Sequence, residues 1–112
     1  MPQLLFRGVP AEKLQTISQP LSEELALICE CGTDNFTMEY VHTTAIYGGL
    51  AEGQSYPFVE VGWFERGQAV RDRFAKAVTE QLARIGVHEL EVAFRTYRED
   101  SYYINGRPCS QA

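Results

Sequence analysis

Hydrophobic and polar residues alternate in four stretches of the chain, and this alternation predicts four β-strands. The stretches cover residues 3–7, 36–46, 57–65 and 89–97, and they are rich in β-branched and aromatic residues. Side chains along a strand point to opposite faces in turn, so each stretch has an apolar face that a second layer of structure must cover. The sequence therefore predicts a sheet with one buried face.

Two other stretches carry apolar residues at steps of three and four, which predicts a helix in each. The first begins at Ala11 and ends before Gly32, and the second covers residues 68–85 and ends at Gly86. The apolar positions are Leu14, Ile17, Leu21, Leu25 and Ile28 in the first helix, and Val70, Phe74, Ala77, Val78 and Ile85 in the second. Pro20 lies away from the apolar stripe of the first helix, so a kink is expected there rather than a break.

Two segments outside these elements have the composition of turns. Residues 47–56 hold three glycines and few apolar anchors, which predicts a loop. Near the C-terminus, Asn105 and Gly106 follow the aromatic residues Tyr102 and Tyr103. Asn-Gly is a strong signal for a tight two-residue β-turn, so the tail is predicted to form a short hairpin.

The order of elements, strand-helix-strand and again strand-helix-strand, predicts an α+β fold of two tandem β-α-β units. Right-handed crossovers would place both helices on one face of a four-stranded mixed sheet, which makes a two-layer α/β sandwich with a short C-terminal hairpin. The other face of the sheet would be open. It would mix apolar with charged residues, namely Leu5, Val41, Ala93 and Phe58 or Phe64 with Arg7, Glu39, Glu60 and Arg95.

An open face of this mixed kind favours self-association. A fully solvated face would be more polar, and a core face would not hold several charged residues. Identical sheets packed about a symmetry axis would cover the apolar residues and pair the acidic side chains with the basic ones. A monomer with a partly apolar open face is the alternative, and we expect the oligomer.

Length and composition are those of one ordinary globular domain. The chain has 112 residues, of which 45% are apolar and 22% are charged, so a single domain over residues 1–112 is expected. A net charge of −5 does not attract the negatively charged phosphates of a nucleic acid, and no apolar run is long enough to span a bilayer. We therefore expect that the protein binds neither nucleic acid nor membrane. Because no basic segment followed by an apolar core opens the chain, we also expect a cytoplasmic location.

The three cysteines, Cys29, Cys31 and Cys109, do not form a metal-binding pattern. A structural zinc site needs four ligands at characteristic spacing, and the two histidines, His42 and His88, lie in unrelated contexts. Reduced structural thiols are therefore expected, with no metal and no cofactor.

Pro2 is the sharpest candidate for chemistry. It follows Met1 directly and opens the first predicted strand, where a residue need not donate a hydrogen bond to the sheet. If Met1 is removed, the nitrogen of Pro2 becomes a free secondary amine. An exposed α-amine has a pKa of about 8, so only about 9% is free base at about pH 7, and desolvation to a pKa of about 6 would make that about 91%. Pro2 would then act as a general base.

The chain resembles the tautomerase superfamily, which includes the oxalocrotonate tautomerases and macrophage migration inhibitory factor. The resemblance rests on Pro2 at the chain start, on the repeated β-α-β unit, and on Pro57, a second proline that opens the third strand. The segments 36–39 (FTME), 56–66 (YPFVEVGWFER) and 102–106 (YYING) are similar to those of a group of small bacterial proteins of unassigned function within this superfamily.

The resemblance implies a homotrimer with pockets at the subunit interfaces and Pro2 in each pocket. Tautomerases of this kind move a proton between carbon and oxygen of an enol or 2-oxo acid, so a small carboxylate is the implied substrate. The arginine that oxalocrotonate tautomerases carry near the start of the second strand is absent here. The substrate-binding candidates are Arg66, Arg95 and Lys13 for the carboxylate and Tyr97 for an enolate oxygen.

Other interpretations stay open at this point. Arg95 has an alternative role as the ion-pair partner of Glu39 or Glu60, and Lys13 has one as a solvated helix residue. A non-catalytic trimeric binding or structural module would use the same fold, with the 47–56 loop and the aromatic tail as its contact surfaces. An RNA-binding sheet would need basic residues around exposed aromatic rings, whereas the open face carries Glu39 and Glu60, so we rank that function last.

Overall fold

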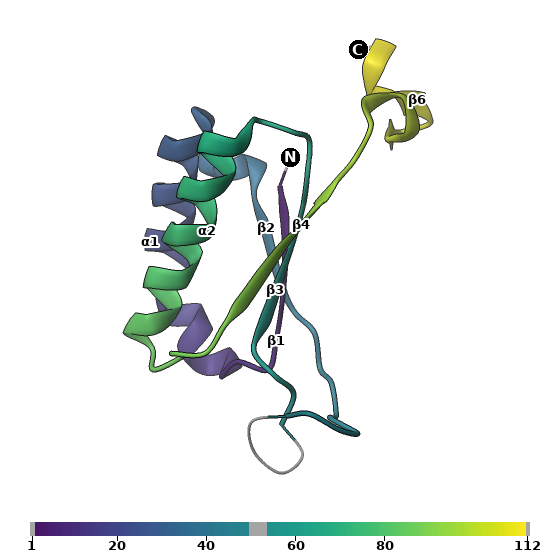
Figure 1. The fold of residues 1–112 in the computed structure, drawn as a ribbon. Coiled ribbons are helices and arrows are strands. Elements are labelled where there is room, and N and C mark those ends of the chain that lie inside the picture. Colours follow the sequence, from purple (N-terminus) through teal and green to yellow (C-terminus); the bar gives the residue numbers. More distant parts are fainter. Residues whose placement is uncertain (1, 50–53, 112) are drawn as a thin grey trace.

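The described part of the chain forms a four-stranded sheet, two long helices and a short hairpin (Figure 1). The computed structural model describes residues 2–49 and 54–111. The strands are β1 (Gln3–Arg7), β2 (Thr37–Tyr40), β3 (Phe58–Trp63), β4 (Glu91–Thr96), β5 (Tyr103–Ile104) and β6 (Arg107–Pro108), and the long helices are α1 (Ala11–Cys29) and α2 (Gln68–Arg84). Single-turn 3₁₀ helices are η1 (Thr33–Asn35), η2 (Glu99–Ser101) and η3 (Cys109–Gln111).

The sheet is mixed, and its strands lie in the order β2-β1-β3-β4. The outer pairs, β1 with β2 and β3 with β4, are parallel. The central pair, β1 with β3, is antiparallel, with Gln3 opposite Gly62 and Arg7 opposite Phe58. Each helix connects two parallel neighbours, and both helices cover the same face of the sheet (Figure 1). The predicted α+β fold of two β-α-β units is confirmed.

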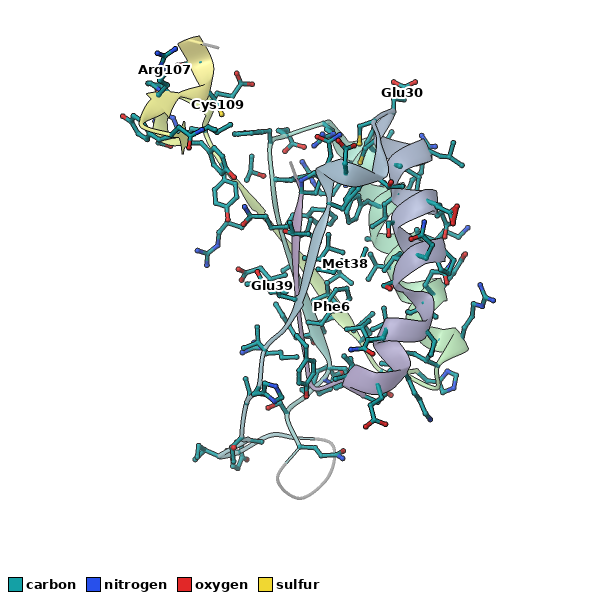
Figure 2. The ribbon with its side chains drawn as sticks, turned by 180° about the vertical axis from the view of Figure 1, so that it is seen from behind. Phe6, Glu30, Met38, Glu39, Arg107 and Cys109 are labelled. Atoms are coloured by element: carbon teal, nitrogen blue, oxygen red, sulfur yellow. The ribbon has the colours of Figure 1, made fainter. Side chains whose placement is uncertain are left out.

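The hydrophobic core lies between the helices and the inward face of the sheet. Side chains without exposed surface come from every second residue of β1 and β3 and from the apolar stripes of both helices: Leu4, Phe6, Val59, Val61, Trp63, Leu21, Leu25, Phe74, Val78 and Leu82. Figure 2 shows Phe6 and Met38 directed toward the helices and Glu39 directed to the opposite side. The alternation in the sequence therefore assigned the two faces of these strands correctly.

Helix α1 continues through Pro20, which lies on its exposed side. The missing hydrogen bond is outweighed by the buried stripe on the other side, which comprises Leu14, Ile17, Leu21, Leu25 and Ala26. The helix ends at Cys29, because Glu30 adopts the left-handed conformation with φ 54° and the next amide returns to the carbonyl of Ala26. None of the helices in residues 2–49 and 54–111 combines the length and the apolar content of a membrane-spanning segment.

The second strand is much shorter than the predicted stretch, 36–46, and that prediction was wrong. β2 ends at Tyr40, which lies opposite Phe6 on its parallel partner β1. Val41 donates one further hydrogen bond, to the carbonyl of Phe6 at 2.8 Å, after which β1 turns away. Strand propensity alone does not hold the following residues without a partner strand. The loop predicted next includes residues 50–53, which lie outside the described residues.

The C-terminal segment leaves the sheet as a separate arm (Figure 1). β5 and β6 pair antiparallel around Asn105 and Gly106, whose φ angles of 52° and 83° are those of a type I′ turn. The predicted terminal hairpin is confirmed. Tyr103 and Ile104 of the arm are 61% and 53% exposed, so the arm presents apolar surface away from the core.

The face of the sheet opposite the helices is open. Leu5 is 36% exposed there. The guanidinium carbon of Arg7 lies 4.7 Å from the centroid of the Phe58 ring, and Nε of Arg95 lies 3.6 Å from Oε1 of Glu60. Apolar side chains and paired charges thus share one surface, as expected for a face that a partner covers.

Candidate functional site

Pro2 lies at the start of β1, at the end of the molecule where α1 ends and α2 begins (Figure 1). Its side chain is fully buried, and its carbonyl accepts a hydrogen bond from the amide of Thr37 at 3.2 Å. Leu4 and Phe6, which follow at intervals of two, face the helices. Because side chains alternate along a strand, the ring of Pro2 faces the helices as well. We call this end of the sheet the Pro2 end.

Arg66 supplies a half-buried guanidinium at the Pro2 end. Its Cζ lies 5.5 Å from the centroid of the Trp63 ring, and its Nη1 donates a hydrogen bond to the carbonyl of Phe64 at 3.3 Å. Across residues 2–49 and 54–111 the guanidinium has no carboxylate partner. Trp63 faces the helices, as Pro2 does, so Arg66 and Pro2 lie on the same side of the sheet.

The thiol of Cys29 lies in the same corner, at the last residue of α1. Burial raises the pKa of Cys29, and the positive charge of Arg66 partly opposes that shift, because a nearby cation favours the thiolate. A raised pKa keeps the thiol protonated at neutral pH, which is the state of an unreactive, packed cysteine. All three cysteines are free thiols. In the described part of the chain, no three side chains of His, Cys, Asp or Glu gather as a metal site would require.

Tyr97 lies at the same end but on the open side of the sheet. Its hydroxyl lies against Gly62, so closely that a Cβ on Gly62 would be 2.6 Å from the hydroxyl oxygen. Gly62 pairs across the sheet with Gln3, the residue that follows Pro2. The Tyr97 phenol is therefore close to the start of β1 without sharing the side on which Pro2 is buried.

Gln3 and Tyr102 also belong to this end, and they were not among the residues predicted for the site. Nε2 of Gln3 donates a hydrogen bond to the hydroxyl of Tyr102 at 3.1 Å. The ring of Tyr102 packs against Phe64, with centroids 5.0 Å apart, and against Tyr97, with centroids 5.3 Å apart. The sequence signalled a turn after Tyr102 but carried no local sign of a contact between the two ends of the chain.

Two predicted substrate-binding residues are not brought to Pro2. Arg95 is level with Gly62 in the sheet, but its guanidinium is paired with Glu60 on the open face, which is the alternative interpretation of this residue. Lys13 is exposed in the first turn of α1, at the opposite end of β1. Of the four substrate-binding candidates, Arg66 and Tyr97 lie at the Pro2 end, and within residues 2–49 and 54–111 neither has a carboxylate partner.

Two large hollows lie at the other end of the sheet. They measure about 480 Å³ and about 500 Å³, and both are lined by Thr43 and Ser55, with Pro10 and Tyr40 in the first and Arg7 in the second. Neither is lined by a residue predicted for catalysis or substrate binding. We place the candidate site at the Pro2 end, because Pro2 and the Arg66 guanidinium lie there on the helix side of the sheet and the Tyr97 phenol lies there on the open side. Neither Arg66 nor Tyr97 has a carboxylate partner among the described residues, and the volume of a hollow alone does not indicate a chemistry.

The chain is similar along nearly its whole length to proteins of unassigned function. A family model described as a domain of unknown function (DUF1904) matches residues 1–108. A DUF1904 protein from Sebaldella termitidis is 36% identical, with a TM-score of 0.85 over 96% of this chain and 99% of that one. A protein of unknown function from Vibrio cholerae is 32% identical, with a TM-score of 0.83 over 96% of this chain and 86% of that one. No curated protein matches the chain.

More distant structures share the fold alone. A macrophage migration inhibitory factor-like protein from Entamoeba histolytica is 11% identical, with a TM-score of 0.71 over 96% of this chain and 97% of that one. The F6 fused 4-OT asymmetric trimer is 13% identical, with a TM-score of 0.76 over 98% of this chain and 96% of that one. The resemblance to a bacterial group of unassigned function is confirmed, and the resemblance to the tautomerase superfamily is confirmed for the fold.

Proposed function

The chain belongs to the DUF1904 family, and we propose that it is a tautomerase-like enzyme that moves a proton between carbon and oxygen of a small 2-oxo or enol acid. In this proposal Met1 is removed, and the nitrogen of Pro2 is the general base. One observation carries the proposal. A fully buried Pro2 and the half-buried guanidinium of Arg66, which has no carboxylate partner in the described part of the chain, share one end and one side of the sheet.

Burial and charge both support Pro2 as a base. Desolvation disfavours the charged ammonium form, and the positive charge of Arg66 disfavours it further, so both effects lower the pKa of an N-terminal amine at Pro2. A fall in pKa from about 8 to about 6 raises the free-base fraction at about pH 7 roughly tenfold. A base whose pKa lies near the working pH is the most effective proton carrier.

The proposed reaction is a proton shift along three atoms. The lone pair of the Pro2 nitrogen takes the proton of the enol hydroxyl, the oxygen electrons form the carbonyl, and the electron pair of the carbon–carbon double bond takes the proton back from Pro2. Arg66 binds the substrate carboxylate through charge-assisted hydrogen bonds. In this proposal the substrate lies across the end of the sheet, and the hydroxyl of Tyr97 on the open side donates to the oxygen that carries negative charge in the enolate. Lys13 and Arg95 have no part in this proposed reaction, because Lys13 lies at the opposite end of β1 and the guanidinium of Arg95 is paired with Glu60.

Untagged protein tests this function in two measurements. Intact mass is expected to show the loss of Met1, and ultraviolet absorbance is expected to show conversion of the enol form of an aryl 2-oxo acid such as phenylpyruvate. Pro2→Ala is expected to lower kcat/KM about 100-fold or more, the usual contribution of a general base. Lys13→Ala, an exposed control at the opposite end, is expected to leave it unchanged. Retention of Met1, or equal rates for the wild type and Pro2→Ala, rejects the function.

We also propose that the open face packs against identical copies in a homotrimer. Leu5 and Val41 are 36% and 37% exposed on this face, beside the ion pair of Arg95 and Glu60. Burying the apolar side chains favours association, and symmetry supplies matching charges. Analytical ultracentrifugation is expected to give three times the chain mass of 12.7 kDa, and Leu5→Asp is expected to give a smaller species.

A matched control for that variant is Leu27→Asp, because Leu27 is 79% exposed and lies on α1, away from the open face. It is expected to sediment as the wild type does. If Leu5→Asp also sediments as the wild type does, the open face is not the interface.

The alternative function is a non-catalytic trimeric binding or structural module. The exposed Tyr103 and Ile104 on the arm favour it, since apolar residues held on a projecting hairpin form a ready contact surface. In this case the protein keeps Met1 and associates, and no enol is converted. Changing both residues to serine would then weaken the association without any change in thermal stability of the domain.

A further inference from the structure

Gly62 is a buried glycine of β3 whose missing side chain makes room for Tyr97. A Cβ at this position would lie 2.6 Å from the hydroxyl oxygen, 2.9 Å from Cε2 and 3.0 Å from Cζ of Tyr97, closer than packed atoms approach one another. Gly62 lies within a regular strand and does not have a positive φ, so the backbone does not require glycine there. A glycine inside a strand marks a close approach by another group. Here that group is the Tyr97 phenol.

The ring of Tyr97 is held by packing, while its hydroxyl is free. The ring lies 6.5 Å from that of Phe64 and 5.3 Å from that of Tyr102, measured between centroids. Within residues 2–49 and 54–111, the tyrosine hydroxyls with side-chain hydrogen-bond partners are those of Tyr56 and Tyr102, and Tyr97 has none. A fixed ring with a free O–H group is a donor that a ligand can use without reorganisation.

Tyr102 provides a second donor beside the first. Its hydroxyl accepts a hydrogen bond from Nε2 of Gln3 at 3.1 Å, which leaves its own proton free to donate. The same contact ties the end of the chain to β1, because Gln3 follows Pro2. The two phenols therefore lie side by side at the Pro2 end, one fixed by the gap at Gly62 and the other by the carboxamide of Gln3.

We propose that Gly62 and Gln3 are positioning residues, and that they hold the Tyr97 and Tyr102 hydroxyls as a pair of donors for the oxygen atoms of the substrate of Pro2. This inference rests on the proposed function and extends it. Two neutral O–H donors beside the Phe64 ring suit the enolate oxygen of a 2-oxo acid whose carboxylate is bound by Arg66.

Binding of phenylpyruvate to the Pro2→Ala protein tests the donor pair without turnover. Titration calorimetry of this parent is compared with the same protein carrying Gly62→Ala, Tyr97→Phe, Tyr97→Ala or Gln3→Met. Each change is expected to weaken binding about 10-fold, the effect of losing or displacing one hydrogen bond. Gly62→Ala acts by displacing the Tyr97 ring, so it is expected to have no further effect in the Tyr97→Ala background.

Three results would overturn the inference: a parent that does not bind phenylpyruvate, a Gly62→Ala variant that binds as the parent does, and a Gly62→Ala effect that persists in full with Tyr97→Ala. Thermal melting accompanies each titration, because an added methyl group in a buried strand also affects folding. If Gly62→Ala fails to fold and the double variant with Tyr97→Ala folds, the steric contact is supported. If the parent binds in a Tyr97-dependent way while the wild type converts no enol, the catalytic function fails and the donor pair stands.

Discussion

Replacing Arg66 by glutamine tests whether its guanidinium serves the Pro2 end. Glutamine keeps a donor for the carbonyl of Phe64 but removes the charge. A charge-assisted hydrogen bond contributes about 1.5–3 kcal/mol, which corresponds to roughly 10- to 150-fold in affinity. KM for the 2-oxo acid is therefore expected to rise by such a factor in Arg66→Gln. Because the guanidinium also disfavours the ammonium form of Pro2, the pH profile of kcat/KM is expected to move to higher pH.

The thiol of Cys29 provides a second measurement that does not depend on catalysis. Burial raises the pKa of Cys29, Arg66 opposes this more than any other cation, and Arg73 opposes it less. In a background with Cys31→Ser and Cys109→Ser, Arg66→Gln is expected to raise the pKa of Cys29 further, as read from the pH dependence of alkylation by iodoacetamide. Arg73→Gln is the matched control and is expected to have a smaller effect.

Three results would refute this reasoning. A Cys29 pKa that Arg66→Gln leaves unchanged, or that Arg73→Gln moves equally, would show that the guanidinium does not lie in this corner. An unchanged KM, with the Cys29 pKa shifted as expected, would show that Arg66 lies there but does not bind the substrate.

Three further predictions concern stability. The hydrogen bond from Arg71 lowers the pKa of Glu65 from its ordinary value of 4.5. The ionised Glu65 therefore stabilises the folded state fully above that pH, and this stabilisation is lost as the pH falls through the folded-state pKa. Glu65→Gln is expected to lower Tm at neutral pH, with a difference that shrinks in acid; a constant difference would contradict this. Phe74→Ala is expected to cost about 3–5 kcal/mol in urea unfolding, because the ring is fully buried, and a cost below about 1 kcal/mol would contradict the packing. Gly106→Ala strains a positive φ in the arm, so it is expected to change NMR shifts there while Tm stays constant; a lowered Tm would show that the arm supports the core.

The sequence predicted the fold well, because each helix and strand follows from the spacing of apolar residues within a single segment. Both helices begin where the apolar spacing begins, and β1 has the predicted bounds. The exception is β2, which ends six residues before the predicted limit of Ile46. The length of β2 is limited by its neighbour β1, and the sequence of β2 does not indicate where β1 ends.

The candidate site was only partly predictable, since it depends on contacts between distant segments. Alternation along a strand predicts on which side of the sheet each side chain lies, so the placement of Pro2 and Tyr97 on opposite sides could have been predicted from the sequence. Gly62 gave a usable signal too, because a glycine inside a strand indicates a close neighbour. The bond between Gln3 and Tyr102 spans 99 positions and leaves no local trace.

The corner on the helix side of the Pro2 end has more donors than acceptors, which bears on the class of substrate. Nε1 of Trp63 is buried without a hydrogen-bond partner among the described residues, and the guanidinium of Arg66 beside it has no carboxylate there. A buried donor left unpaired costs about 1–3 kcal/mol. The thiol of Cys29, held protonated by burial, supplies no negative charge to offset them. An anionic oxygen would satisfy such donors, whereas a neutral carbonyl would leave the charge of Arg66 unmatched. If Pro2 is the base of the proposed reaction, these donors favour a carboxylic acid over a neutral ketone as its substrate.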